Sequence, residues 1–82
     1  MFVVYVLYSQ TYDKIYVGYT SSLEERFKSH NELSHKGWTK AFRPWEIIYK
    51  EIFDSKSAAM QREKQLKTAK GRLWIRTTFI DV

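Results

Sequence analysis

The sequence has no cysteine, one proline and three glycines among its 82 residues. Without cysteine, a disulfide framework and a thiolate metal site are excluded, and a reducing compartment, the cytoplasm, is the expected location. The longest apolar run, Phe2–Leu7, is far shorter than the roughly 20 residues that cross a bilayer, so we expect no membrane partner. No stretch has the composition of a signal peptide or of a linker.

Size and composition favour one domain that covers residues 1–82. Hydrophobic residues make up 44% of the chain, which is more than a disordered chain carries. A chain of this length buries only about 60–65% of its unfolded surface, which excludes two independent cores. We therefore expect a compact, soluble domain.

The hydrophobic pattern predicts a small α/β (α+β) domain of the order β-β-α-β-α. The expected elements are strands at 2–8 and 14–20, a helix at 23–33, a strand at 45–53 and a helix at 56–70. The short polar connection between the first two strands predicts an antiparallel hairpin. The result is a three-stranded antiparallel sheet flanked by helices.

Four local features make this prediction more specific. Gly18 inside the second strand indicates a bulge or a close approach by another group. Gly71 is the expected end of the last long helix. In the third strand, alternation places four side chains on one face: Trp45, Ile47, Tyr49 and Phe53. The final segment is expected to pack three side chains over the core: Leu73, Trp74 and Phe79.

The net charge of +5 is concentrated in one part of the chain. Residues 1–54 contain equal numbers of basic and acidic side chains. Residues 55–76 contain a single acid, Glu63, among these bases: Lys56, Arg62, Lys64, Lys67, Lys70, Arg72 and Arg76. Glu63 lies at the edge of the inward stripe of its helix, whereas Lys56, Lys64 and Lys67 are expected to point outward. Such a segment suits a polyanion, and a solvated helix face is the alternative.

Candidate nucleic-acid contacts come from this segment and from the loop at residues 34–43, which is rich in aromatic and basic side chains. They are Arg62, Lys64, Lys67, Lys70, Arg72, Lys40 and Arg43.

Five further side chains together have the inventory for phosphodiester cleavage. Tyr5 and Tyr16 lie in the middle of the hairpin strands, Arg26 and His30 share a flank of the first helix, and Glu63 lies in the last. Taken singly, each has a structural alternative: a packed phenol, a polar group at a helix edge, or a carboxylate paired with a lysine one turn on. Together they offer a water-positioning group, a cation for the developing charge and a hard oxygen ligand for a divalent metal.

The order and spacing of these residues resemble the GIY-YIG nuclease superfamily. The two signature tripeptides are Val3-Val4-Tyr5 and, after ten residues, Tyr16-Val17-Gly18, and Val3 stands where the name has glycine. The matches that follow are Arg26, His30 and Glu63, with Tyr19 as a further candidate. Two stretches resemble the short, single-domain branch of that superfamily: Tyr16–Asn31 and Ala59–Lys67.

The resemblance implies an endonuclease that uses one divalent metal, Mg²⁺ or Mn²⁺. Tyr16 would act on the attacking water, with Tyr5 beside it. Arg26 would stabilise the charge on the phosphate, and His30 would assist proton transfer. Glu63 would be the sole protein ligand of the metal.

The resemblance also indicates the substrate. Relatives with defined cutting tasks usually carry an added domain that selects the DNA, and none is visible in this sequence. We therefore expect cutting of branched, damaged or single-stranded DNA, or cutting directed by a targeting protein, in repair or recombination. Two alternatives stay open: a nucleic-acid-binding module without turnover, and a protein-interaction unit with the Trp38–Trp45 loop as its contact.

Overall fold

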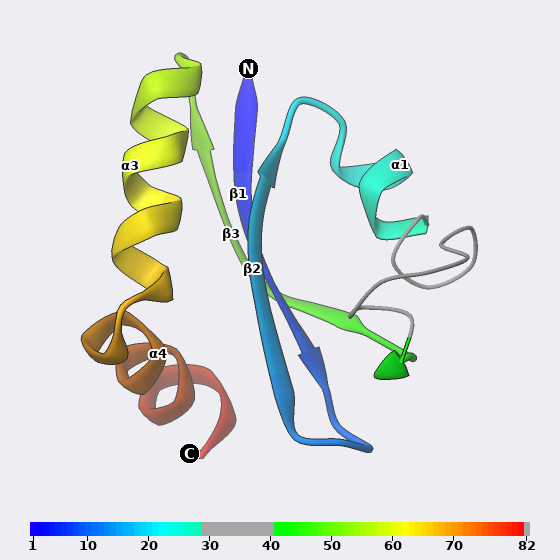
Figure 1. Cartoon of the computed structure of the whole chain (residues 1–82). Coiled ribbons are helices and arrows are strands. Elements are labelled where there is room, and N and C mark those ends of the chain that lie inside the picture. Colours follow the sequence, from blue (N-terminus) through cyan, green and yellow to red (C-terminus); the bar gives the residue numbers. More distant parts are fainter. Residues whose placement is uncertain (29–40, 82) are drawn as a thin grey trace.

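The computed structural model describes residues 1–28 and 41–81, and the structural statements below concern these residues. Three strands, β1 (Phe2–Ser9), β2 (Lys14–Thr20) and β3 (Glu46–Phe53), form one antiparallel sheet in the order β2-β1-β3. The central position of β1 explains its nearly uninterrupted apolar sequence, because both of its faces are covered. β2 is an edge strand, which is important for the site below (Figure 1).

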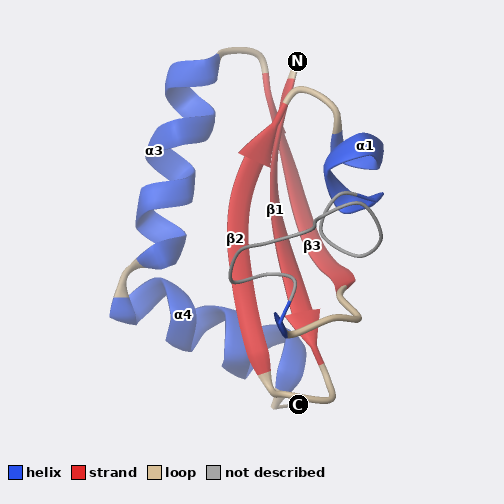
Figure 2. Cartoon of the chain, turned by 45° about the vertical axis from the view of Figure 1, so that its right-hand side comes forward, coloured by secondary structure: helices blue, strands red, loops and turns tan. Residues whose placement is uncertain are grey.

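Helices cover the two faces of the sheet. The short helix α1 (Leu23–Lys28) lies on one face, and the longer α3 (Lys56–Lys67) and α4 (Ala69–Ile75) lie on the other (Figures 1 and 2). A π-helical segment, η2 (Arg76–Ile80), continues from α4. This confirms the predicted fold class. The expected continuation of the first helix to Leu33 lies outside the described residues. Among the helices of the described part, none is long and apolar enough to cross a membrane.

Alternation along β1 divides the core into two clusters. The cluster beneath α3 and α4 consists of Val4, Val6, Ile15, Val17, Ala59, Leu66 and Ile75. The cluster on the α1 face consists of Tyr5, Leu7 and Trp45, with Tyr16, Leu23, Phe27 and Phe42 packed around them. Successive side chains of a strand point to opposite faces, so the even positions of β1 serve the first cluster and the odd positions serve the second.

The prediction that the large side chains of the third strand share one face of the sheet is wrong. The register between β1 and β3 shifts by one residue, which leaves Ile48 without a partner in β1. Tyr49 and Phe53 pack against the cluster beneath α3, whereas Trp45 lies in the cluster on the α1 face. A bulge adds one residue to one strand and so reverses the face of the residues beyond it.

Gly71 does not end the last long helix. α3 ends at Lys67, and the Thr68 hydroxyl accepts a hydrogen bond from the Gly71 N–H at 3.1 Å, which begins α4. A Cβ atom at Gly71 would lie 2.6 Å from the Leu66 Cα atom, so the glycine permits close packing of α4 against the end of α3. The chain therefore turns between two helices at Thr68, a helix N-cap residue.

The helical form of the final segment also changes which of its side chains face the core. Ile75 is fully buried, while Leu73 is 63% exposed, so the expected packing of Leu73 is wrong. Phe79 packs against the main cluster as expected. Trp74 is exposed at its rim and contacts the Tyr49 ring, with 5.5 Å between centroids, and the Phe79 ring, with 5.4 Å.

Two ion pairs connect the α3 and α4 layer to the sheet. Arg62 Nε lies 2.8 Å from Glu51 Oε2 on β3. Arg76 Nη1 lies 2.9 Å from Asp13 Oδ1 in the turn between β1 and β2, and the Tyr8 hydroxyl donates a 2.9 Å hydrogen bond to the same oxygen. Asp13 has φ of 54°, a conformation that Asp tolerates in turns.

Candidate active site

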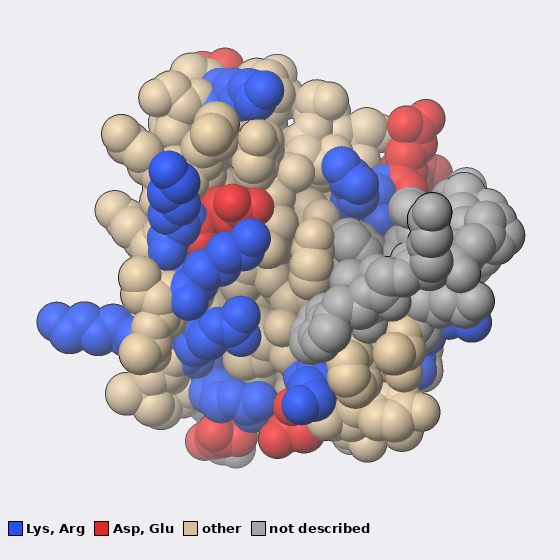
Figure 3. Space-filling view, viewed as in Figure 1, with Lys and Arg blue, Asp and Glu red and all other residues tan. Residues whose placement is uncertain are grey.

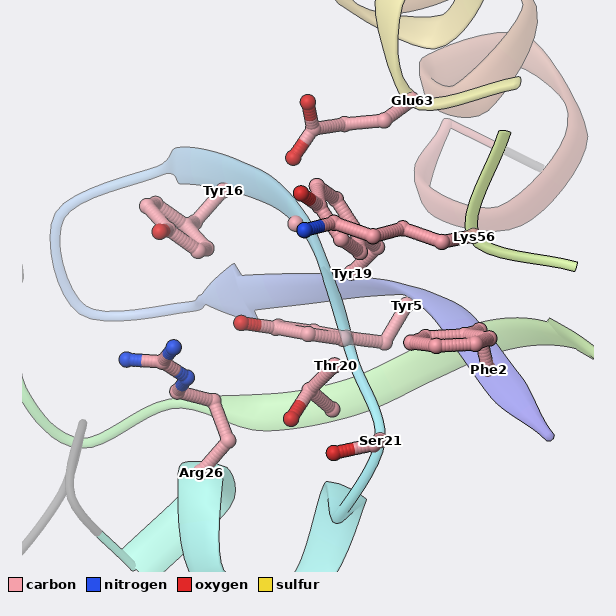
Figure 4. A pocket seen from close by; sticks show the side chains of 10 residues that line it. Phe2, Tyr5, Tyr16, Tyr19, Thr20, Ser21, Arg26, Lys56 and Glu63 are labelled. Atoms are coloured by element: carbon pink, nitrogen blue, oxygen red, sulfur yellow. The ribbon is translucent and has the colours of Figure 1, made fainter. Parts of the chain in front are cut away.

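A pocket of about 520 Å³ lies beside the edge strand β2. Of the five side chains with the inventory for phosphodiester cleavage, four line it: Tyr5, Tyr16, Arg26 and Glu63. The fifth, His30, lies outside the described residues. The close-up in Figure 4 shows these side chains converging from the β1–β2 hairpin and from two helices.

The pocket bends around the edge of the sheet. Tyr5 and Tyr16 belong to the α1 face, while Tyr19 packs on the α3 face. Figure 4 shows β2 passing between two groups of side chains, with Glu63 on one side of the strand and Arg26 on the other. Because β2 is an edge strand, side chains from both faces meet next to it without a second sheet strand between them.

Gly18 makes room for the two phenols. A Cβ atom at Gly18 would lie 2.6 Å from Tyr5 Oη, closer than real Cβ atoms approach, and 3.0 Å from Tyr16 Cε1, a tight contact. The β1–β2 pairing is regular at this position, with Gly18 opposite Tyr5, so there is no bulge here. The close approach expected from the sequence is therefore made by these tyrosine side chains.

The two phenols have different environments. Tyr5 is 1% exposed, and Tyr16 is half-buried. Their ring centroids are 6.2 Å apart. Burial raises the pKa of Tyr5 above its usual value, the neighbouring Tyr16 and a hydrogen bond with it raise this pKa further, and the Arg26 charge opposes the increase. Tyr5 therefore stays neutral at physiological pH.

Arg26 reaches the pocket because α1 begins directly after β2. The Ser22 N–H donates to Thr20 Oγ1 at 3.1 Å, and the Arg26 N–H donates to the Ser22 carbonyl at 3.1 Å to form the first turn. The guanidinium is exposed, and Figure 4 shows it at the end of the pocket where the hydroxyls of Tyr5 and Tyr16 also lie. A cation here can contact an incoming phosphate.

Glu63 supplies the carboxylate of the pocket. It lies on α3 between the buried residues Ala59 and Leu66, and its side chain is only 17% exposed. Its Oε2 atom lies 3.6 Å from Lys67 Nζ, so the i,i+4 pair considered as a structural alternative is present. The pair is long and Lys67 is largely exposed, so it is worth only about 0.2–0.5 kcal/mol. Pairing therefore does not prevent Glu63 from binding another cation.

Comparison with known proteins agrees with this geometry. Residues 1–76 match the GIY-YIG catalytic domain. The chain belongs to the GIY-YIG family. It is 43% identical over 56 residues to a UPF0213 protein of Staphylococcus haemolyticus, covering 68% of each chain. It is also 43% identical over 65 residues to a UPF0213 protein of Natronomonas pharaonis, covering 79% of this chain and 75% of that one.

A solved structure has the same fold. The solution NMR structure of a UPF0213 protein from Bacillus halodurans superposes with a TM-score of 0.56 at 25% identity, covering 94% of this chain and 84% of that chain. GIY-YIG membership implies nuclease activity in general, with DNA as the substrate class and a divalent metal as the usual requirement. The UPF0213 relatives add no substrate or pathway.

The donor set of this GIY-YIG pocket suits a hard divalent cation. In residues 1–28 and 41–81, no group of three or more His, Cys, Asp or Glu side chains could form a protein cage for a metal. Mg²⁺ commonly binds through one or two carboxylates and keeps several waters. A largely buried Glu63 carboxylate facing an open pocket of about 520 Å³ fits that mode of binding.

Sequence reasoning missed Lys56, which was expected to point outward but lines the pocket. The signal was present, because Lys56 and Glu63 are seven residues apart, or two helical turns, and so share a face of α3. The pocket is also lined by Phe2, Thr20 and Ser21, and no pattern in the sequence indicates them as site residues.

The expected nucleic-acid contacts differ in how exposed they are. Arg62 binds Glu51 and lies over the Trp74 ring at 5.5 Å, so its guanidinium is used within the domain. Several lysine and arginine side chains gather over α3 and α4 in Figure 3. The exposed candidates are Lys64, Lys67, Lys70, Arg72 and Arg43, and Lys40 lies outside the described residues. Their role in binding DNA stays a prediction.

Proposed function

We propose that this domain is a divalent-metal-dependent endonuclease that hydrolyses DNA phosphodiester bonds. The observation that carries the proposal is the meeting of Tyr16, Arg26 and Glu63 in one pocket from both faces of the sheet. Each of these groups would be an ordinary surface or core side chain if the pocket did not bring it to the others.

Arg26 would bind the phosphate that reacts. Hydrolysis adds a water oxygen to phosphorus, breaks one P–O bond to the sugar, and increases the negative charge on the remaining phosphate oxygens. A guanidinium donates in a planar fork that matches two of these oxygens. Its position beside the phenols supports a role in stabilising that charge.

The two phenols would have different roles toward the attacking water. Tyr5, whose pKa burial raises, stays protonated, so it is a positioning residue and not the base. Tyr16, half-buried and facing the pocket, would orient the attacking water and accept its hydrogen bond. His30, which the sequence places on the same helix as Arg26, would assist the transfer of a proton to or from the reacting oxygens.

Glu63 would hold Mg²⁺ or Mn²⁺ through its carboxylate. A bound divalent ion of this kind lowers the pKa of a coordinated water and offsets phosphate charge. The contribution of the chain itself is a carboxylate held at the edge of a buried helix face, where water is partly excluded and electrostatic interactions are stronger than in bulk solvent.

We further propose that DNA form, not base sequence, selects the substrate. The exposed cations on α3 and α4 are of the type that contacts phosphates, and phosphate contacts carry no direct sequence information. Branched, damaged or single-stranded DNA, or DNA delivered by a targeting protein inside the cell, fits this arrangement. The use would be in repair or recombination.

Cleavage assays on purified variants test this function. With Mg²⁺ or Mn²⁺ and a panel of single-stranded, nicked and branched DNA, we expect cutting by the wild type and a loss of at least about a hundredfold in Glu63→Gln and in Arg26→Ala. The control is Glu24→Gln, which removes an exposed carboxylate from α1. Circular dichroism should show that all variants stay folded. Equal cutting by Glu63→Gln and the control would contradict the proposal.

The exposed lysines also favour a second candidate, a nucleic-acid-binding module without turnover. In that case the wild type would bind DNA with strong salt dependence, yield no product with either metal, and bind equally well as Glu63→Gln. Binding without product across the whole panel would favour this candidate over the endonuclease.

A further inference from the structure

The pocket extends beyond the residues that the proposed reaction uses. Its lining continues to Lys56 at the start of α3 and to Ser21 directly after β2. A phosphate group takes the space of a few water molecules, each about 30 Å³ in the liquid. A pocket of about 520 Å³ therefore has room for more of a DNA strand than the reacting phosphate.

Lys56 is a cation directed into this space. Figure 4 shows its side chain reaching from the start of α3 toward the middle of the pocket, with the ammonium between the Glu63 carboxylate and the Tyr5 ring in that view. Among the described residues, Lys56 forms no ion pair, whereas the partner of Glu63 is Lys67. The lysine is therefore not explained as the counter-ion of Glu63.

The helix itself gains nothing from Lys56. It is the first residue of α3, where a positive charge opposes the helix dipole, and the first turn contains no acidic residue to offset it. The N-cap is made by the Ser55 hydroxyl, which accepts from the Ala58 N–H at 3.2 Å and does not involve Lys56. A residue that is locally unfavourable and points into a pocket is more consistent with ligand binding than with stability.

Ser21 offers a hydroxyl to the same pocket. It is exposed, and its hydroxyl makes no hydrogen bond within the described part of the chain. The neighbouring Thr20 hydroxyl is already used in the turn, since it donates to the Ser22 carbonyl and accepts from the Ser22 N–H. A lysine and a serine hydroxyl suit a phosphodiester, which offers acceptor oxygens and one negative charge.

We infer that Lys56 binds the phosphate next to the one that is cleaved, in a pocket that the Ser21 hydroxyl also lines. This subsite rests on the proposed endonuclease function and adds a contact that fixes which way the strand runs through the pocket. Arg26 and Lys56 would then hold two successive phosphates from opposite faces of the sheet.

The first experiment maps phosphate contacts by cutting. Oligonucleotides with one uncharged methylphosphonate at a defined position are digested, and each cut is located on a gel, so the cut itself sets the register. For the wild type, we expect about tenfold less cutting at the bond on one side of the neutral position. In Lys56→Ala this suppression at the neighbouring bond should disappear, while cutting at the neutral position itself stays suppressed.

Lys50→Ala is the matched control, because it removes an exposed lysine of β3 that does not line the pocket. It should retain the wild-type pattern. If Lys56→Ala keeps the neighbour suppression as well, the inference is overturned. A changed Mg²⁺ requirement with an unchanged pattern would also overturn it, since Lys56 would then act on Glu63.

A binding measurement separates this inference from the endonuclease proposal. In EDTA, the affinity for a fluorescent single-stranded oligonucleotide is measured from about 20 to about 200 mM salt, roughly the range over which counterion release is resolved. Lys56→Ala should lower the slope of log K against log salt by about 0.7 relative to Lys50→Ala. This outcome supports the phosphate contact even if the wild type cuts no DNA, and equal slopes would contradict it.

Discussion

The α1 face and the α3 face of the sheet contribute different groups to the pocket. The α1 face provides the two phenols and the Arg26 guanidinium, and the α3 face provides Glu63 and Lys56. The α3 face also has more stabilising contacts with the sheet, since it has the larger buried cluster and two ion pairs to the sheet. On the α1 face, Leu23 and Phe27 are only half-buried.

Neither face therefore contains a complete site. The two phenols and Arg26 lie on one side, and the metal-type ligand Glu63 and the Lys56 cation lie on the other. They meet because β2 is an edge strand and because Gly18 leaves space beside it. Changes at this junction should affect activity, and changes in the ion pairs that connect the α3 and α4 layer to the sheet should affect stability.

The largest effect is expected at the junction, from Gly18→Ala. The added methyl would lie 2.6 Å from Tyr5 Oη and 3.0 Å from Tyr16 Cε1, so the Tyr5 ring must shift and the Tyr16 ring must move slightly. A displacement of about 1 Å in a catalytic group commonly costs about a hundredfold in rate. We expect that loss in the DNA cleavage assay at a temperature where the variant is folded, since overpacking beside the buried Tyr5 should also lower the free energy of unfolding by about 1–3 kcal/mol. Unchanged cleavage would show that the arrangement of the catalytic groups does not depend on the space that Gly18 leaves.

An intermediate effect, on stability alone, is expected from Glu51→Gln. The substitution removes the partner of Arg62 in a pair whose side chains are 30% and 25% exposed, so the free energy of unfolding should fall by about 1 kcal/mol. Urea unfolding measures this change. Cleavage at a temperature where the variant is folded should equal that of the wild type. A large loss of activity would mean that the two faces are coupled through β3.

The smallest effect is expected from Asp13→Asn. In the folded state, the hydrogen bond from Arg76, and after it the hydrogen bond from Tyr8, lower the pKa of the Asp13 carboxyl. A lowered folded pKa gives stability that is present above the unfolded pKa and is lost as pH falls through the folded one. Stability of the wild type should therefore decline below about pH 4, and the variant should show less of this decline. Thermal unfolding of both proteins, followed from about pH 7 down to about pH 2, measures the difference.

Much of the fold was predictable because its signals are local. The apolar run of β1 and the composition of β2 identify a hairpin without reference to the rest of the chain. The regular spacing from Tyr5 to Tyr16 and on to Arg26 needs only this hairpin and the helix after it. Four of the five grouped side chains therefore line the pocket, with His30 outside the described residues.

The errors occurred where a residue depends on register or on a distant neighbour. A single bulge reversed the face of Trp45, and no local pattern announces it. The sequence predicts a helix end at Gly71, whereas close packing on Leu66 explains this glycine. The sequence predicts that Lys56 points outward, because the pocket that it enters is formed by elements distant in sequence.

Propensity and periodicity act over a few residues, so the amino-acid sequence was enough to specify the strands, the helices and the chemical types available for a site. Long-range contacts determined that these groups share one pocket. That outcome depends on the strand order β2-β1-β3, which leaves β2 at the edge, and on the packing of α3 against the sheet, which brings Glu63 and Lys56 around it. Both are properties of contacts between distant segments, which alternation and composition do not encode.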